Sequence, residues 1–293
     1  MNRKQALERA REILAENNIE DISLECELLL RHTLKIDRVQ LYLKLGDELT
    51  PQHESEFWQY VERRAGGEAT AYITGHREFF GLDFHIDRRV LIPRPETELL
   101  VEKAISLAKD YPGIIIAEIG TGCGAIAICL ALNLPRARIY ATDISATALE
   151  VASLNSERHG VANRITFLHG DMLAPLPEPV ELIVANLPYI RSDELNDIRE
   201  PLPALDGGPN GLEKIFKLGY QLAYKLRAGG QLLLEVGQGQ SSTVTSWLCR
   251  LFPNAKIETI PDLAGIERVV SLTSVAASRG TGQLDTELSR MLN

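Results

Sequence analysis

The chain has 293 residues, of which 45% are hydrophobic, and its formal net charge is −9 at pH 7. A chain of this size and composition can bury a substantial core and is expected to form two domains. The excess of acidic residues argues against an enzyme that holds a nucleic-acid duplex through its phosphates, so no direct nucleic-acid partner is expected.

The sequence start and the cysteine pattern favour a cytoplasmic protein. The polar start, Met1-Asn2-Arg3-Lys4, runs into a helical pattern without the apolar core of a signal peptide. No stretch is apolar enough to span a bilayer. The four cysteines are scattered and form no Cys-x-x-Cys pair, which favours reduced thiols over a disulfide framework. The six histidines are equally dispersed, so we expect no metal site.

The first part of the chain has apolar residues at helical spacing, as in Ala6, Ala10 and Leu14. Thr50-Pro51 is typical of a helix start, with proline in the first turn. We expect residues 1–77 to form a helical bundle domain. Alternating residues around Gly81 then predict a β-hairpin linker over residues 78–93.

A strand–helix rhythm follows and predicts an α/β domain over residues 94–276 with a doubly wound, mostly parallel sheet. The last two strands are separated by a connector too short for a crossover helix, so they should pair antiparallel. The polar tail, residues 277–293, is expected to be flexible. The strands expected from this pattern are residues 114–119, 138–144, 165–169, 182–185, 231–236, 256–260 and 268–273. The helices expected between them are residues 98–109, 125–132, 146–158 and 212–226.

A glycine-rich loop marks the turn between the first strand and its helix. It reads Glu118-Ile119-Gly120-Thr121-Gly122-Cys123-Gly124, and its glycines let a ligand lie directly against the backbone. Asp143, at the end of the next strand, is placed to accept hydrogen bonds from ribose hydroxyls. Because Ala125 completes a nicotinamide fingerprint, this loop by itself fits NAD as well as S-adenosylmethionine.

The segment Asn186-Leu187-Pro188-Tyr189 favours S-adenosylmethionine over NAD. It follows a short apolar strand and surrounds one point with an amide, a stiffened backbone carbonyl and an aromatic ring. Such a corner suits a planar –NH2 group that must be gripped and made nucleophilic, whereas hydride transfer has no need of it. S-adenosylmethionine is therefore the expected cofactor. Asp171 and Met172, after the third strand, are where its adenine would be flanked.

The motifs together resemble those of the HemK/PrmC methyltransferases, in order from about residue 70 to residue 274. Besides the glycine loop and the Asn-Leu-Pro-Tyr corner, the matching stretches are Gly-His-Arg-Glu-Phe-Phe-Gly at 75–81, Leu-Ile-Pro-Arg-Pro-Glu-Thr-Glu at 91–98, Glu-Pro-Leu-Pro-Ala-Leu-Asp-Gly-Gly at 200–208 and Ala-Gly-Ile-Glu-Arg at 264–268. The resemblance implies a seven-stranded S-adenosylmethionine-dependent methyltransferase (Rossmann-like) domain with an N-terminal helical bundle and a β-hairpin linker.

The resemblance also implies an activity and a partner. Members transfer a methyl group from S-adenosylmethionine to the side-chain amide nitrogen of the glutamine in the Gly-Gly-Gln (GGQ) loop of class I peptide chain release factors. The cofactor residues implied are Glu118, Gly120, Thr121, Gly122, Cys123, Gly124, Asp143, Asp171, Met172 and Asn186. The helical N-terminal domain is implied to dock the release factor.

The catalytic and substrate-binding residues are expected to be Asn186, Leu187, Pro188 and Tyr189, with Arg94 as a further substrate contact. The Asn186 side-chain oxygen and the Leu187 carbonyl would accept the two amide hydrogens, and Tyr189 would pack on the amide. The family usually has proline where this chain has Leu187; leucine keeps the carbonyl but loses the locked φ. Met172 departs as well, since an aromatic residue often stands there.

Three alternatives stay open at this point. Adenine presents a similar planar amine, so an adenine-amino methyltransferase acting on nucleic acid is one of them, although net acidity counts against it. A glutamine of a ribosomal protein is a second possible substrate. A binding module attached to an inactive methyltransferase fold is the third, and the intact set of Glu118, Asp143 and Asn186 argues against it.

Overall fold

The computed structural model describes residues 1–17, 19–196 and 199–274. The chain divides into two compact units, a helical unit (Met1–His76) and a sheet unit (Arg77–Asn293). Each unit has a hydrophobic core of its own. The tail that we expected to be flexible, residues 277–293, lies outside the described residues.

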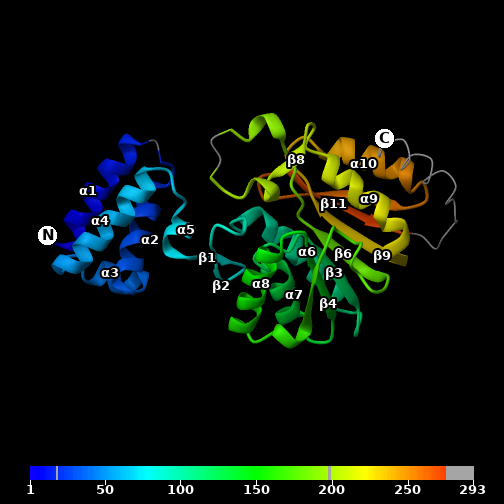
Figure 1. The fold of residues 1–293 in the computed structure, drawn as a ribbon, viewed down its shortest axis with the longest axis horizontal. Coiled ribbons are helices and arrows are strands. Elements are labelled where there is room, and N and C mark those ends of the chain that lie inside the picture. The colour runs from blue at the N-terminus through cyan, green and yellow to red at the C-terminus, as the bar shows by residue number, and fades with distance from the viewer. Residues whose placement is uncertain (18, 197–198, 275–293) are drawn as a thin grey trace. The chain divides into compact units, whose positions relative to one another are not determined.

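The helical unit packs its helices side by side (Figure 1). Their apolar side chains form one buried core, as expected of amphipathic helices. Its core includes the fully buried side chains of Leu14, Leu29, Leu30 and Phe57. Thr50 caps the fourth helix by accepting a hydrogen bond from the backbone N–H of His53, as the Thr-Pro signal predicted. The helices are α1 (Arg3–Glu16), α2 (Ile22–Leu34), α3 (Arg38–Leu43), α4 (Pro51–Ala65) and α5 (Thr70–Thr74).

A short two-stranded sheet of β1 (His76–Phe79) and β2 (Leu82–His85) follows the helices. Phe80 and Gly81 form its turn, and both have positive φ, 52° and 71°, as a two-residue type I′ turn requires. The backbone N–H of Phe80 donates to the Glu98 carboxylate at 2.8 Å. The hairpin runs from His76 to His85, whereas we expected it over residues 78–93. Residues 86–94 contain no strand.

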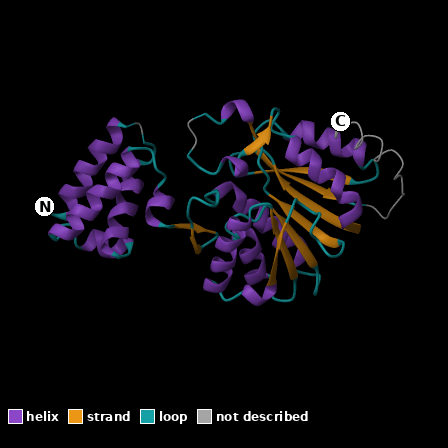
Figure 2. Ribbon diagram, viewed as in Figure 1, coloured by secondary structure: helices purple, strands orange, loops and turns teal. Residues whose placement is uncertain are grey.

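The sheet unit contains a seven-stranded sheet in the order β10-β11-β9-β6-β3-β4-β5 (Figure 2). β3 pairs in parallel with both β4 and β6, while β11 is antiparallel to both β9 and β10. This arrangement confirms the predicted parallel sheet closed by an antiparallel hairpin. The strands are β3 (Ile115–Ile119), β4 (Arg138–Asp143), β5 (Ile165–His169), β6 (Val180–Ala185), β9 (Leu226–Glu235), β10 (Lys256–Pro261) and β11 (Glu267–Thr273).

Helices cover both faces of this sheet, with α6, α7 and α8 on one face and α9 and α10 on the other (Figures 1 and 2). Four of them lie within a residue of the predicted ranges, but α10 was not predicted from the sequence. A two-residue strand, β7 (Ile190–Arg191), pairs with β8 (Asp206–Gly208) outside the main sheet. The helices are α6 (Glu98–Ala108), α7 (Ala125–Asn133), α8 (Ala146–Arg158), α9 (Glu213–Lys225) and α10 (Ser241–Leu251), and a 3-10 turn, η1 (Pro95–Thr97), precedes α6.

α9 and α10 meet at a glycine in the middle of α9. A Cβ added at Gly219 would lie 2.0 Å from Cη2 of Trp247, which is far too close for real atoms. The Trp247 ring is held there by Phe216 and Tyr220, whose ring centroids are 4.6 and 5.6 Å away. Gly219 is therefore required by packing, although glycine is a poor helix former.

We expect Gly219→Ala to destabilise the protein, because its methyl group overlaps the buried Trp247 ring. Alanine improves helix propensity by about 1 kcal/mol, whereas overpacking of this kind costs about 1–3 kcal/mol and displaces the ring. The measurement is the urea midpoint, with Trp fluorescence as probe. In a Trp247→Leu background the same substitution should be neutral or stabilising. A raised midpoint in the wild-type background would contradict this account.

Candidate active site

The predicted site residues come together at the carboxyl ends of the parallel strands. β3 lies between β4 and β6 (Figure 1). In the register of these pairs, Glu118 stands opposite Ala141 on one side and Val184 on the other. This register brings the loops after β3, β4 and β6 to the same edge of the sheet. The chain runs from β3 to β4 on one side and reaches β6 on the other, which makes this edge a topological switch point, where ligands bind in open α/β sheets.

The loop after β3 has the shape that its glycines predicted. Gly120, Gly122 and Gly124 all have positive φ, between 55° and 83°. A Cβ added at Gly124 would lie 3.1 Å from Cβ of Ala152, so this glycine allows α7 and α8 to pack closely. A Cβ added at Gly122 would meet nothing within 4 Å. The loop therefore leaves open space beside its backbone at Gly122, where a ligand can approach.

Glu118 lies beneath this loop rather than on its surface, with only 1% of its area exposed. Its Oε2 accepts hydrogen bonds from the Thr121 hydroxyl at 2.6 Å and from the backbone N–H of Ala127 at 3.0 Å. Burial raises the pKa of its carboxyl to about 8, although these hydrogen bonds oppose the shift. Glu118 thus ties the loop to the first turn of α7. That it also contacts a cofactor stays a prediction.

Asp143 connects the loops that follow three strands. Its Oδ2 accepts from the backbone N–H of Gly122 at 2.9 Å, and its Oδ1 accepts from Ser145 at 2.8 Å. Its backbone carbonyl accepts from Gly170, after β5. Each carboxylate oxygen has a further lone pair, so Asp143 can still accept a hydrogen bond from a ligand hydroxyl.

The other predicted cofactor residues have varied surroundings. Asp171 forms an ion pair with Lys217, at the surface of α9. Met172 has a positive φ of 53°, and it is buried in the core cluster of the sheet unit. Cys123 is also buried, which raises the pKa of its thiol to about 12. Its backbone carbonyl accepts a hydrogen bond from the side chain of Asn155. The roles of Asp171 and Met172 beside an adenine ring stay predictions.

The Asn-Leu-Pro-Tyr corner leaves β6 and is fixed by its side chains. The amide nitrogen of Asn186 donates to the hydroxyl of Thr97 at 3.0 Å. The Leu187 side chain is buried in the core cluster of the sheet unit. Within the described residues, no hydrogen bond reaches Oδ1 of Asn186 or the carbonyl oxygen of Leu187. Two acceptors of the corner are therefore available to a ligand.

Tyr189 closes the corner over a buried acid. Its hydroxyl donates to Oε1 of Glu235, at the end of β9, over 3.5 Å. Burial and the charge of Glu235 raise the pKa of Tyr189 to about 12, so its phenol is neutral at pH 7 and is no base. Burial also raises the pKa of Glu235, to about 7.

A glycine-rich segment lies directly against the backbone of this corner. A Cβ added at Gly211 would lie 2.4 Å from the Tyr189 carbonyl oxygen, and one at Gly207 would lie 2.8 Å from that of Pro188. Gln240 donates to the Tyr189 carbonyl at 2.9 Å and accepts from the backbone N–H of Gly237. These contacts hold the corner from the side of β8 and α10.

Arg94 does not stand free in the linker before η1. Its guanidinium forms an ion pair with Glu200, whose other carboxylate oxygen accepts from the backbone N–H of Ile92 at 3.2 Å. Arg94 therefore ties the linker to the segment before β8. A contact between Arg94 and a substrate stays a prediction.

Sequence reasoning missed three residues that support the corner: Thr97, Glu235 and Gln240. Thr97 stands inside the Arg-Pro-Glu-Thr-Glu stretch, but nothing in that stretch names its partner 89 residues away. Glu235 carried a signal that could have been used, because a carboxylate directly follows the apolar, buried run Leu232-Leu233-Leu234 at the end of β9. Such a residue at the edge of a parallel sheet is a site candidate.

Two general properties of the described residues complete this account. No helix among them combines the length and apolar character needed to cross a membrane. In the same part of the chain, no cluster of three or more His, Cys, Asp or Glu residues is arranged to hold a metal ion.

The sequence matches two family models, described as "PrmC N-terminal domain" over residues 5–75 and "Methyltransferase small domain" over residues 96–199. Among solved structures, a methyltransferase from Pyrococcus furiosus superposes with a TM-score of 0.52 at 18% identity, covering 67% of this chain and 91% of that one. The hMettl16 catalytic domain, solved with the MAT2A 3′UTR hairpin 6, gives 0.54 at 18% identity and covers 75% of this chain and 83% of its own. These likenesses show the methyltransferase fold.

Curated relatives are similar over nearly the whole chain. The "Release factor glutamine methyltransferase" of Moorella thermoacetica is 43% identical over 274 residues, which cover 92% of this chain and 97% of the relative. The protein of the same name from Bradyrhizobium diazoefficiens is 38% identical and covers 91% of this chain and 94% of its own. The chain belongs to the release factor glutamine methyltransferase family.

Proposed function

We propose that this protein transfers a methyl group from S-adenosylmethionine to the side-chain amide nitrogen of the glutamine in the GGQ loop of class I release factors. The observation that carries the proposal is the pair of unused acceptors at the Asn186–Leu187 corner, next to the open glycine loop. A primary amide offers two N–H groups, and two acceptors suit it. The names of the relatives support a release factor as substrate.

The residues present fit the proposed cofactor. The loop from Gly120 to Gly124 has open space beside Gly122, where a side chain would otherwise obstruct a ligand. Asp143, at the end of the adjacent strand, retains acceptor capacity for ribose hydroxyls. Asp171 and Met172 would flank the adenine. When bound, S-adenosylmethionine supplies an electrophilic methyl group on a sulfonium.

The corner would act mainly by positioning the amide nitrogen. A carboxamide nitrogen is a poor nucleophile because its lone pair is delocalised into the carbonyl. By accepting the two N–H groups, Asn186 Oδ1 and the Leu187 carbonyl would aim this lone pair and offset the positive charge that develops on nitrogen. The neutral Tyr189 would pack on the amide and help to exclude water. The proton can leave after transfer, so the site needs no strong base.

We expect Asn186→Ala to bind S-adenosylmethionine almost normally and to lose about 100-fold or more in kcat, the effect of removing one preorganised electrostatic partner. Binding is measured by calorimetry and turnover by label transfer from S-adenosylmethionine to a release factor. An unchanged transfer rate in this variant would show that Asn186 does not position the substrate amide.

The substrate is tested by offering release factor, ribosomal protein and RNA in parallel, with labelled S-adenosylmethionine. A release factor whose Gly-Gly-Gln glutamine is replaced serves as the matched control and should stay unlabelled. Label that appears only in RNA, or only in the ribosomal protein, would replace the proposed substrate with that one.

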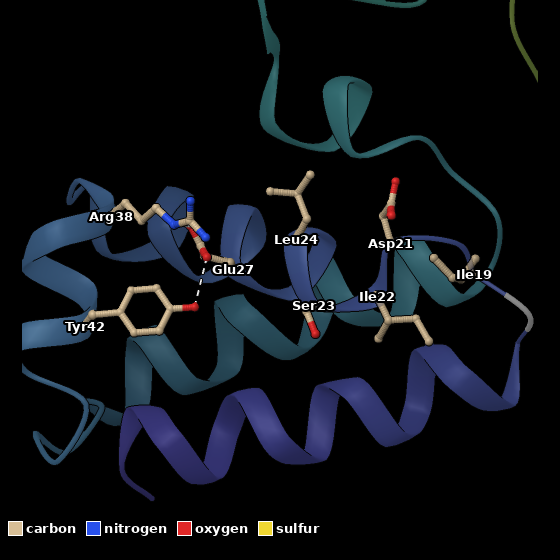
Figure 3. A pocket seen from close by; sticks show the side chains of 8 residues that line it. All are labelled: Ile19, Asp21, Ile22, Ser23, Leu24, Glu27, Arg38 and Tyr42. Atoms are coloured by element: carbon tan, nitrogen blue, oxygen red, sulfur yellow. Dashed lines mark hydrogen bonds and ion pairs between the residues drawn. The ribbon is translucent and has the colours of Figure 1, made fainter. Parts of the chain in front are cut away.

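We further propose that the helical unit docks the release factor through α3. Val39, Tyr42 and Leu43 share one face of this short helix, and Val39 and Leu43 are 66% and 78% exposed. Tyr42 also lines a pocket of about 470 Å³, together with Arg38 of α3 and with residues of α2 and of the segment before it (Figure 3). In the lining of this pocket the buried Glu27 accepts a hydrogen bond from the Tyr42 hydroxyl at 3.1 Å and forms an ion pair with Arg38 at 3.0 Å. This network holds the apolar face of α3 in place.

We expect Leu43→Asp, combined with Val39→Asp, to raise the KM for release factor about ten-fold, the effect of losing about 1.4 kcal/mol of binding free energy. The kcat and the affinity for S-adenosylmethionine should not change. Tyr111→Asp is the matched control, because Tyr111 is an equally exposed apolar residue, 66%, between α6 and the start of β3, away from the site. If wild type, the double variant and Tyr111→Asp have equal KM values for release factor, α3 is not part of the docking surface.

A further inference from the structure

The side chain of Asn155 joins the glycine loop to the β-hairpin. Asn155 lies on α8 and is completely buried. Its Nδ2 donates to the Cys123 carbonyl, in the glycine loop, at 2.9 Å and to the His85 carbonyl, at the end of β2, at 3.0 Å. Its Oδ1 accepts from the backbone N–H of His85 at 2.8 Å. One carboxamide therefore holds two backbone segments that are far apart in the sequence.

These three hydrogen bonds fix the orientation of the Asn155 amide. A primary carboxamide has two N–H groups and one carbonyl oxygen. The nitrogen here meets two carbonyl oxygens, and Oδ1 meets an N–H. A reversed amide would put Oδ1 against the His85 carbonyl and Nδ2 against the His85 N–H, so that acceptor would face acceptor and donor would face donor. The hairpin backbone therefore keeps an amide hydrogen directed at Cys123.

A glycine allows α8 to come close enough to the glycine loop for this contact. Ala152 and Asn155 are three residues apart in α8 and so share one face of the helix. A Cβ added at Gly124 would lie 3.1 Å from Cβ of Ala152, so a side chain at position 124 would press α8 away from the loop. The close packing of Gly124 on Ala152 therefore brings Asn155 within reach of the Cys123 carbonyl.

The Cys123 carbonyl is one of two anchors of the dipeptide Gly122-Cys123. The other anchor is the backbone N–H of Gly122, which donates to Asp143 at 2.9 Å. The dipeptide is thus held at its first N–H from the end of β4 and at its last carbonyl from α8. The open space beside the loop lies at Gly122, between these two anchored groups in the chain.

The hairpin that orients Asn155 is itself packed on the sheet unit. β2 lies beside α8 (Figure 1). The ring of Phe84 is completely buried, and its centroid is 6.2 Å from that of Phe79 and 5.0 Å from that of His159, the residue after α8. Nε2 of His159 lies 3.0 Å from the carbonyl oxygen of Asp83. The hairpin is thus a firm support for the Asn155 amide.

We propose that Asn155 is a positioning residue of the cofactor site. Held by the hairpin, it fixes the Cys123 carbonyl and so keeps the glycine loop in the shape that accepts S-adenosylmethionine. This inference rests on the proposed function, in which S-adenosylmethionine is the ligand of the loop. A loop that already has its binding shape loses less conformational entropy when the ligand binds, and it therefore binds more tightly. Asn155 need not touch the cofactor itself.

The first test compares Asn155→Leu with Phe84→Leu. Leucine has nearly the size of asparagine but makes none of the three hydrogen bonds, whereas Phe84→Leu changes the ring contacts of the hairpin and none of the bonds of Asn155. We expect the S-adenosylmethionine affinity, measured by calorimetry without release factor, to fall about ten-fold in Asn155→Leu, the effect of losing one hydrogen bond. Phe84→Leu lowers the melting temperature as well but should bind within about two-fold of wild type. Equal affinities in these two variants would overturn the proposal.

The second variant, Asn155→Asp, separates the two partners of the amide and is available should the leucine variant not fold. At pH 8 its carboxylate still accepts from the backbone N–H of His85 but donates to neither carbonyl. We expect the same loss of S-adenosylmethionine affinity as in Asn155→Leu. An affinity equal to that of wild type would show that the bond to His85 is sufficient, and it would contradict the role of the bond to Cys123.

A readout without ligand is the hydrogen exchange of the glycine loop in the protein alone. The N–H of Gly122 donates to Asp143 and that of Gly124 to the Thr121 carbonyl. Both should exchange about ten-fold faster or more in Asn155→Leu, because local opening becomes easier, and at the wild-type rate in Phe84→Leu. If wild type does not bind S-adenosylmethionine, the proposed cofactor fails, whereas the exchange still reports on the loop. Unchanged exchange in Asn155→Leu would overturn the positioning role alone.

Discussion

The loops of the active site meet because β3 pairs in parallel with both β4 and β6. Parallel pairing in register carries the carboxyl ends of these strands to one edge of the sheet. The glycine loop, Asp143 and the Asn186 corner follow β3, β4 and β6 directly, so their positions are consequences of this pairing. β9 lies beside β6 and adds Glu235 to the same edge. A change that shifted the register of β3 would therefore move the glycine loop away from Asp143, the Asn186 corner and Glu235 at the same time.

Two buried carboxylates support this edge, and they oppose folding at neutral pH. Burial raises the pKa of Glu118 to about 8 and that of Glu235 to about 7, both above the ordinary value of 4.5. Both groups bind protons more tightly in the folded than in the unfolded state, so their contribution to stability improves as the pH falls from about 8 toward 4.5. Glu118 accepts the hydrogen bonds that hold the glycine loop, and Glu235 accepts the hydrogen bond of the Tyr189 hydroxyl in the corner. Neither role can be filled by an apolar residue.

Leu187, in place of the usual proline, gains a packing role. Its side chain belongs to the buried core of the sheet unit, and a Cβ added at Gly120 would lie 3.5 Å from its Cδ2. The Leu187 side chain therefore lies beside Gly120 of the glycine loop. Pro188 still disfavours a helical conformation for Leu187. The backbone of Pro188 and Tyr189 is contacted by Gln240, Gly207 and Gly211.

The sequence by itself determined the elements whose signals are local. Apolar runs and glycine turns predicted the seven strands, the loop at Gly120 and the acid at Asp143, because strand period and turn chemistry depend on near neighbours. Helix α10 was missed, and the hairpin after residue 76 was placed too late. Only the tertiary structure joined Thr97 to Asn186 and placed Glu235 beneath Tyr189. Those contacts bridge segments 46 to 89 residues apart, and a hydrogen bond between such segments depends on the packed sheet, not on any local pattern.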